Sequence, residues 1–369
     1  MRDPYARRVH IPLKKRIALN LHDRYRKNEA RLHRLNYIMW ECTRRCNLNC
    51  RHCGSDCQQD AATPDMPAGD FLKAIDQVLP SIQPETTTIV FTGGEPLLRN
   101  DLEQVGLELY NRRFPWGLVT NGMLLDEKRL ESLLKAGLRT ITVSLDGLQK
   151  NHNWLRGHGN SFKTASHAVK LLARTEGIKF DVVTCVNRRS LEEIQELRDW
   201  LIAQGVKKWR LFSIFPSGRA ADDPNLSLSG KEFREMMEFI QSTRKEGLID
   251  VKYGCEGFLG DFEGEVRDHF FFCRAGINIA SIMVDGTITG CTSIQDKFPQ
   301  GNIYQDNFAD VWENRFEKMR DRSWTKTGIC AECDFYRHCE GNGTHLWDEK
   351  ENEPAFCHLH KLYGSEEEK

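Results

Sequence analysis

Three cysteines spaced as Cys46-x3-Cys50-x2-Cys53 constrain this chain more than any other feature of its sequence. They directly follow residues 37–40, an apolar run with the composition of a short β-strand. One short loop can therefore wrap all three thiols around a single metal centre. Thiolates are soft ligands that suit iron–sulfur clusters or zinc, and a set of three leaves a coordination position for an exogenous ligand.

The remaining cysteines and the composition narrow the alternatives. Cys42 and Cys57 lie close enough in sequence to complete a four-thiolate zinc site, so spacing alone leaves that alternative open. Basic residues interrupt the N-terminus, which carries no apolar signal core, and we expect a cytoplasmic protein. Because cytoplasmic thiols stay reduced, the thirteen cysteines favour metal ligation over disulfides. The 52 basic and 53 acidic residues balance, so the overall charge does not indicate a nucleic-acid partner.

From residue 37 onward, β-rich runs alternate with amphipathic helical stretches, which predicts an α/β fold with a parallel sheet. After a helix at 231–245 the composition changes to cysteine, glycine and aromatic residues. We therefore predict a basic N-terminal extension at 1–36, an α/β unit at 37–250 and a cysteine-rich domain at 251–369. Six strands are predicted, at 37–40, 88–91, 118–119, 140–145, 180–186 and 209–215.

With its position after the first strand, the motif Cys46-x3-Cys50-x2-Cys53 resembles that of the radical S-adenosylmethionine (SAM) superfamily. The resemblance implies a partial (β/α)6 barrel whose three thiolates hold a [4Fe–4S] cluster. It also implies that the fourth iron chelates SAM, which is cleaved to methionine and a 5′-deoxyadenosyl radical. His52 stands where the family often has an aromatic residue near the adenine, and a surface histidine is the alternative.

Further motifs fall at the ends of predicted strands, where α/β barrels build their sites. Gly93-Gly94-Glu95 matches the family's turn for the SAM ammonium, and glycine lets the chain approach a ligand closely. Ser144 and Arg156 match residues that fix the SAM carboxylate, for which a hydroxyl and a guanidinium are suited. Thr120, Asn121 and Asp146 could equally be strand-end groups that cap turns. Leu211 could pack on the adenine, but we favour a core residue for it, as for Cys185.

The C-terminal cysteines resemble the SPASM extension, which typically carries two auxiliary [4Fe–4S] clusters. The family pattern has one more cysteine, at a position where this chain has Gly343. The cluster nearer the barrel then has an open iron, or His338 or His345 substitutes, or it is smaller or absent. A structural zinc ribbon is the alternative for the last four cysteines. The resemblance assigns Cys330, Cys333, Cys339 and Cys357 to one cluster, and Cys255, Cys273 and Cys291 to the other.

The SPASM resemblance implies a peptide or protein substrate, as in peptide maturases, with a reductant such as flavodoxin or ferredoxin. Sulfatase maturation is disfavoured, because Thr292 stands where those enzymes place an aspartate base. Tetrapyrrole modification in the haem pathway stays open, since such enzymes can also have an incompletely ligated auxiliary cluster. A non-catalytic iron–sulfur electron carrier or a zinc-binding protein is the alternative from another functional class.

The first 36 residues carry eleven lysines and arginines against three acids, and residues 17–35 are predicted to form a helix. Such a helix could face an acidic peptide or membrane headgroups. We favour a solvated helix that packs against the edge of the barrel.

Overall fold

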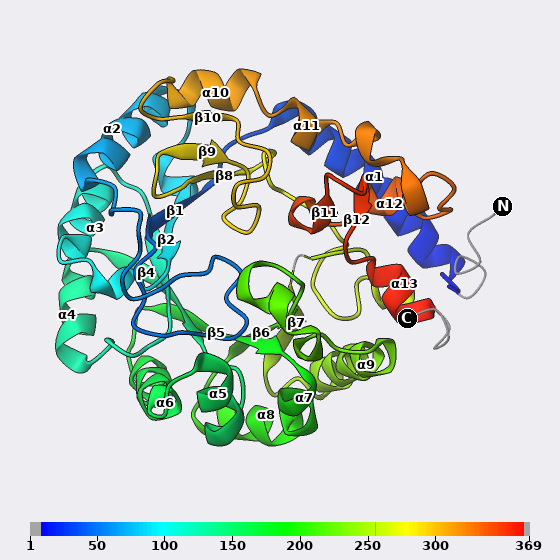
Figure 1. The fold of residues 1–369 in the computed structure, drawn as a ribbon, viewed down its shortest axis with the longest axis horizontal. Helices are drawn as coiled ribbons and strands as arrows, with labels where there is room; N and C mark the ends of the chain where they lie inside the picture. The colour runs from blue at the N-terminus through cyan, green and yellow to red at the C-terminus, as the bar shows by residue number, and fades with distance from the viewer. Residues whose placement is uncertain (1–8, 255, 365–369) are drawn as a thin grey trace.

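The computed structural model describes residues 9–254 and 256–364 and shows a curved α/β layer with helices on its outer side (Figure 1). All six predicted strands form and pair in parallel in chain order. They are β1 (Tyr37–Thr43), β2 (Thr88–Gly93), β3 (Trp116–Thr120), β4 (Leu138–Ser144), β5 (Lys179–Val186) and β6 (Lys208–Ser213).

The sheet continues past both ends of this six-stranded barrel. β7 (Asp250–Tyr253) pairs in parallel with β6, and β8 (Ile279–Ile282) pairs in parallel with β1. β9 (Thr287–Thr289) and β10 (Gly301–Asn302) then add antiparallel strands beyond β8. Residues after 250 therefore supply both edges of the ten-stranded sheet, and the cysteine-rich region is continuous with the barrel. A two-stranded ribbon, β11 (Trp347–Asp348) and β12 (Glu353–Pro354), lies apart.

Helices connect the parallel strands and cover their outer face (Figure 1). The predicted helix at 231–245 is α9, which begins at a Ser229/Glu232 capping box and ends at Gly247. The barrel helices are α2 (Ala68–Val78), α3 (Leu102–Asn111), α4 (Glu127–Lys135), α5 (Gln149–Arg156), α6 (Ser161–Ala173), α7 (Arg188–Glu192), α8 (Ile194–Ala203) and α9 (Gly230–Glu246). The C-terminal helices are α10 (Phe308–Asn314), α11 (Glu317–Arg320), α12 (Tyr336–Cys339) and α13 (His358–Tyr363).

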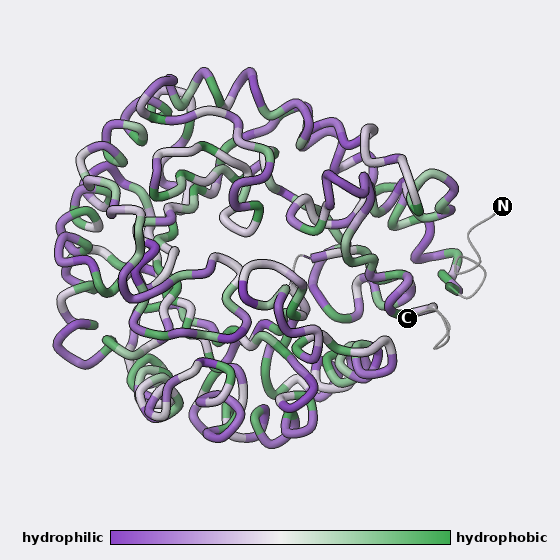
Figure 2. The backbone as a smooth tube through the Cα atoms, in the orientation of Figure 1, coloured by the Kyte–Doolittle hydropathy of each residue, from purple (hydrophilic) through white to green (hydrophobic). Residues whose placement is uncertain are grey.

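Aromatic side chains fill the space between the sheet and helices α2 and α3. Trp40 of β1 stacks on Phe71 with ring centroids 4.1 Å apart, and Phe91 of β2 stacks on Trp116 at 5.2 Å. All four rings are fully buried, and each contributes on the order of 2–3 kcal/mol of hydrophobic stabilisation. This core holds β1 and β2, whose carboxyl ends carry the site, as one rigid unit. In Figure 2, hydrophilic residues dominate the outer turns of the surrounding helices.

The predicted basic helix is α1 (Leu13–Leu32), and it packs against the C-terminal domain instead of the barrel edge that we expected. Asp23 forms ion pairs with Arg337 and His338, and Arg26 forms one with Glu340. The buried face of α1 carries charged residues whose partners lie near α12, which explains the difference. Residues 1–8 of the basic extension lie outside the described residues. No helix in the described part of the chain combines the length and apolar character needed to cross a bilayer.

Candidate active site

The cysteine loop follows β1 directly, and protein contacts fix its shape. The Cys46 N–H donates to the Gln58 carbonyl at 2.9 Å, which closes the loop on itself. Arg219, which follows β6, reaches across the mouth of the barrel: its Nε donates to the Cys50 carbonyl at 2.8 Å and its Nη1 to the Cys57 carbonyl at 3.0 Å. The loop is therefore anchored at both ends of the six-stranded barrel.

The turn Gly93-Gly94 holds the start of the cysteine loop. The Gly94 N–H donates to the Thr43 carbonyl at 2.7 Å, and the next residue bonds the Arg45 carbonyl. A Cβ built at Gly93 would lie 2.1 Å from Thr43 O, and one at Gly94 would lie 2.1 Å from Arg45 O. The glycines thus permit close approach to the cysteine loop, in addition to any approach to a ligand.

Glu95 has a fully buried carboxylate whose oxygens are engaged by the protein. It accepts bonds from Leu97 N at 3.0 Å, Thr120 Oγ1 at 2.8 Å and Asn121 N at 2.8 Å. Burial raises the pKa of Glu95 even though these donors oppose the shift. Glu95 therefore joins the ends of β2 and β3 through these three hydrogen bonds.

Asp146 is the centre of a buried charge cluster at the end of β4. Its Oδ2 lies 2.5 Å from Arg156 Nε and 3.7 Å from His52 Nε2, and its Oδ1 accepts a bond from Cys185 N at 2.9 Å. Burial, the largest influence, raises the pKa of Asp146, but the Arg156 charge and the nearby histidines outweigh it and bring the pKa to about 2. The interpretation of Asp146 as a simple turn cap was therefore incomplete.

The predicted SAM-contacting residues surround this cluster. Arg156 Nη1 also donates to Cys50 Sγ at 3.7 Å, so the guanidinium already links Asp146 to the cysteine loop. Burial lowers the pKa of His52 to about 4, so its imidazole is neutral at pH 7. Ser144 is half-buried at the end of β4, paired with Val183 of β5. Asp146 brings His52 and Arg156 together, and Ser144 lies two residues before Asp146, at the end of the same strand, β4.

Of the two residues expected in the core, Leu211 is fully buried as predicted, whereas Cys185 is not a core residue. Cys185 is half-buried and lines a cavity inside the barrel. Side chains alternate between the two faces of β5, and the side chain of Cys185 points into the barrel. At this height the barrel interior is an open cavity instead of a packed core.

The described cysteine sulfurs do not form a compact site for a single zinc ion. Thiolates bound 2.3 Å from one tetrahedral zinc lie about 3.8 Å apart. Among the described residues, no three cysteine sulfurs lie within 4.8 Å of one another; one group of three ligand atoms that close exists, and it comprises His52, Asp146 and Cys185. No three described cysteines are therefore arranged as a ready-made tetrahedral zinc site.

Hydrogen-bond donors also point at the sulfurs of the cysteine loop. Asn121 Nδ2 lies 3.9 Å from Cys46 Sγ, and the Cys57 N–H lies 3.4 Å from Cys53 Sγ. Such donors stabilise thiolates and are among the groups that tune iron–sulfur clusters. With Arg156 at Cys50, each of the three loop cysteines has a donor of its own.

The last four cysteines converge in the C-terminal domain. Burial and, to a smaller extent, the neighbouring Cys339 and Cys333 together raise the pKa of Cys330 to about 12. The pKa of Cys357 is raised to about 12 in the same way, by burial and by Cys330 and Cys333. Asn342 N–H donates to Cys339 Sγ at 3.2 Å. Residues far apart in the sequence thus form one four-thiol group.

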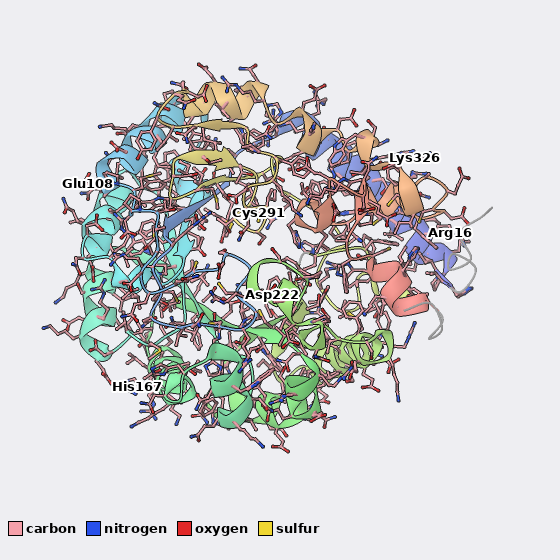
Figure 3. All side chains as sticks on the ribbon, in the orientation of Figure 1. Arg16, Glu108, His167, Asp222, Cys291 and Lys326 are labelled. Carbon is pink, nitrogen blue, oxygen red and sulfur yellow. The ribbon has the colours of Figure 1, made fainter. Side chains whose placement is uncertain are left out.

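The structure describes two of the three cysteines that are predicted to bind the other auxiliary cluster. Cys273 Sγ lies 3.5 Å from the Thr344 N–H and 3.4 Å from its Oγ1. Cys291 follows β9, and Figure 3 shows it on the inner side of the curved α/β layer. Cys255, the third predicted ligand, lies outside the described residues. The structure therefore describes two thiols of this set, and of these Cys273 lies close to Thr344.

A cavity of about 310 Å³ lies between the cysteine loop and the C-terminal domain. Gln295 Nε2 donates to Ser55 Oγ at 2.7 Å and bridges the two regions beside it. The cavity walls come from the carboxyl ends of β2, β5 and β6 and from loops on either side. They include His52, Thr92, Cys185, Phe215, Glu256 and Thr292.

Glu256 anchors a buried polar network at this wall that sequence reasoning missed. Its Oε2 accepts bonds from Ser213 Oγ at 2.7 Å and from the Tyr253 hydroxyl, which also contacts His358 Nε2 at 2.9 Å. Burial raises the pKa of Glu256. The four residues come from three separate stretches of chain, so no local motif marks them.

Comparisons with known proteins agree with this geometry. Residues 40–201 match the radical SAM superfamily, and residues 273–334 match SPASM, described as an iron-sulfur cluster-binding domain. The AdoMet-dependent heme synthase of Methanosarcina barkeri is 28% identical over 327 residues, which cover 82% of this chain and 90% of that protein. The mycofactocin maturase MftC of Mycolicibacterium smegmatis is 26% identical, with 82% and 76% covered.

A solved structure, native anSMEcpe with bound AdoMet and Cp18Cys peptide, aligns with a TM-score of 0.69 at 19% identity and covers 89% of this chain and 96% of that one. This likeness shows the shared fold. The family models imply a SAM-binding [4Fe–4S] cluster and auxiliary iron–sulfur clusters. The chain belongs to the radical SAM superfamily and carries a C-terminal SPASM domain.

Proposed function

We propose that this enzyme abstracts hydrogen from a peptide or protein side chain held in the cavity between the cysteine loop and the C-terminal domain. Cys46, Cys50 and Cys53 would hold the SAM-binding cluster, which when bound supplies the electron that cleaves SAM to a 5′-deoxyadenosyl radical. Residues 37–250 would form the catalytic barrel and residues 251–369 the auxiliary domain. The basic region 1–36 would be an extension docked on the latter.

The composition of the cavity wall carries the choice of substrate. Among the described residues, no lysine or arginine lines the cavity, and Glu256 is its one acidic side chain. Tetrapyrroles of the haem pathway carry several carboxylates, which proteins bind with arginine or lysine. A wall of this kind instead suits a neutral or cationic peptide side chain.

The side chains at the cavity have roles that follow from their positions. Gly93 and Gly94 would present backbone groups to the SAM ammonium, with Ser144 and Arg156 at its carboxylate. His52, neutral and at the wall, would lie beside the adenine. Phe212 and Phe215 give the far side an apolar surface, which excludes water from the space where a reactive carbon must meet its target.

A haem-pathway reaction is the second candidate, and sequence similarity favours it. The heme synthase relative is 28% identical over most of both chains, slightly above the 26% of the peptide maturase. Identities this close do not separate substrate classes, whereas the charge of the cavity wall supports the peptide. Sulfatase maturation is disfavoured further because Thr292 lines the wall at the position of the expected aspartate.

The test uses anaerobically reconstituted full-length enzyme with SAM and dithionite. We expect 5′-deoxyadenosine formation to rise when a short precursor peptide encoded beside the gene is added, together with a mass change in that peptide. Deuterium at the target carbon should transfer to 5′-deoxyadenosine. Cys50→Ala should abolish the product. A mass change in an added coproporphyrin but in no peptide would establish the haem-pathway candidate, and no 5′-deoxyadenosine under any condition would refute both.

A further inference from the structure

The near auxiliary site is the one to which the sequence assigns Cys255, Cys273 and Cys291. It has three thiols at most, whereas a four-iron cluster has four ligand positions. A [4Fe–4S] cluster takes four protein ligands when none is exogenous. Cys330, Cys333, Cys339 and Cys357 already group together elsewhere. Cys273 and Cys291 remain, with Cys255 at most as a third. A fourth ligand must therefore be a different side chain or a group from outside the protein.

The imidazole of His345 fills the space beside Gly343. A Cβ built at Gly343 would lie 2.7 Å from His345 Cε1 and 2.9 Å from His345 Nδ1. Any side chain at position 343 would therefore collide with the ring. The histidine ring occupies the volume that a residue 343 side chain would need, and the glycine is what makes room for it.

The chain around His345 is also in contact with the segments that carry the near cysteines. Thr344, its immediate neighbour, donates its backbone N–H to Cys273 Sγ. The Gly343 N–H donates to the carbonyl of Glu256, the residue after Cys255, at 3.0 Å. The chain that carries His345 is therefore hydrogen-bonded to both of these segments.

His345 has no competing partner that would hold its nitrogen atoms. Within the described residues, its one aromatic contact is with the Phe215 ring, at 4.8 Å between centroids, and no hydrogen bond engages the imidazole. Phe215 lines the barrel cavity. The half-buried ring therefore stands at the cavity side of the near auxiliary site with both nitrogens uncommitted.

His338 is engaged elsewhere. Its Nδ1 lies 3.0 Å from Asp23 Oδ1 of α1, and its ring packs against Phe258 at 6.0 Å. His338 therefore ties the N-terminal helix to the C-terminal domain, and it offers a matched control for His345.

We propose that His345 is the fourth ligand of the near auxiliary cluster, through an imidazole nitrogen on the cavity side. This inference rests on the SPASM domain holding such a cluster, as the proposed function assumes. Imidazole is an established iron ligand beside thiolates in other cluster types, so the donor chemistry is suitable.

The experiment uses the full chain with Cys46→Ala, Cys50→Ala and Cys53→Ala, so that reconstitution loads the auxiliary clusters alone. Dithionite-reduced samples are compared by pulsed electron paramagnetic resonance, with natural histidine and with ¹⁵N-labelled histidine. We expect a directly coordinated nitrogen signal that changes with the isotope. In this background His345→Ala and His345→Cys should lose the signal, and His338→Ala should keep it. His345→Cys should retain about eight irons per chain.

Two outcomes would overturn the proposal: a fully iron-loaded parent with no histidine nitrogen coupling, or a coupling that persists in His345→Ala or His345→Cys. The labelled parent needs no substitution at His345, so a poorly folding alanine variant does not remove the test. A parent with only about four irons per chain would show that the near cluster is absent and would also refute it. If the wild-type chain showed the nitrogen signal but formed no 5′-deoxyadenosine, the proposed function would fail while the ligand assignment stood.

Discussion

Replacing Asp146 with asparagine should destabilise the protein strongly, because it leaves the buried Arg156 charge without its partner. The pKa of Asp146 is lowered from 3.8 to about 2, a shift that corresponds to about 2 kcal/mol of stability. Since the folded-state pKa is the lower one, this contribution is complete above about pH 4 and is lost as the pH falls toward 2. Breaking a buried ion pair typically costs about 3–5 kcal/mol. We expect Asp146→Asn to cost roughly that amount at pH 7.

The assay is urea unfolding of the metal-free chain, followed by tryptophan fluorescence. Glu131→Gln is the matched control, because it makes the same change in the exposed Glu131–Lys135 pair, whose side chains are 66% and 74% exposed. That variant should leave the unfolding midpoint unchanged. The double variant Asp146→Asn/Arg156→Gln should lose less stability than the two single changes added together. A midpoint for Asp146→Asn equal to that of Glu131→Gln would refute the role given to the buried pair.

Two further predictions concern the cysteine loop. Gly94→Ala should lower the iron bound after reconstitution severalfold, because the added Cβ would lie 2.1 Å from Arg45 O. The control Gly69→Ala should bind iron normally, because a Cβ there has no atom within 4 Å. Equal iron contents in the two variants would contradict this prediction. In the metal-free chain, hydrogen bonding from Cys57 lowers the pKa of Cys53 from 9.0 to about 6, so alkylation of Cys53, read by mass spectrometry, should rise through pH 6 and be complete above it. Cys57→Ala should move this transition to higher pH and Cys42→Ala should not; an unmoved transition in Cys57→Ala would show that Cys57 is not its cause.

The strands and the cysteine loop were accessible from sequence because their signals are local. All six barrel strands formed where β-rich runs alternate with amphipathic stretches, and α9 formed with a capping box at its start. The loop cysteines lie within eight residues, so their convergence needs only a turn. Cys185 was misjudged because strand composition does not say whether a barrel interior is filled or open at a given height.

Contacts between distant segments were not accessible. The packing of α1 on the C-terminal domain depends on ion pairs between residues more than 300 positions apart, such as Arg26 and Glu340. The role of Asp146 depends on a buried arginine and on Cys185 of the next strand. No periodicity or spacing encodes these partners, because they meet only when the sheet has curved and closed.

The sequence by itself determined the chemistry that this protein can support: thiols at cluster spacing, a glycine turn after the second strand and a C-terminal cysteine set. The tertiary structure decided where the charges lie and which side chains line the cavity. It left the cavity wall without a cation in the described residues and placed His345 against Gly343. The physical reason is that burial and electrostatic pairing depend on which segments the fold brings together, whereas the type of ligand atom is a property of each residue alone.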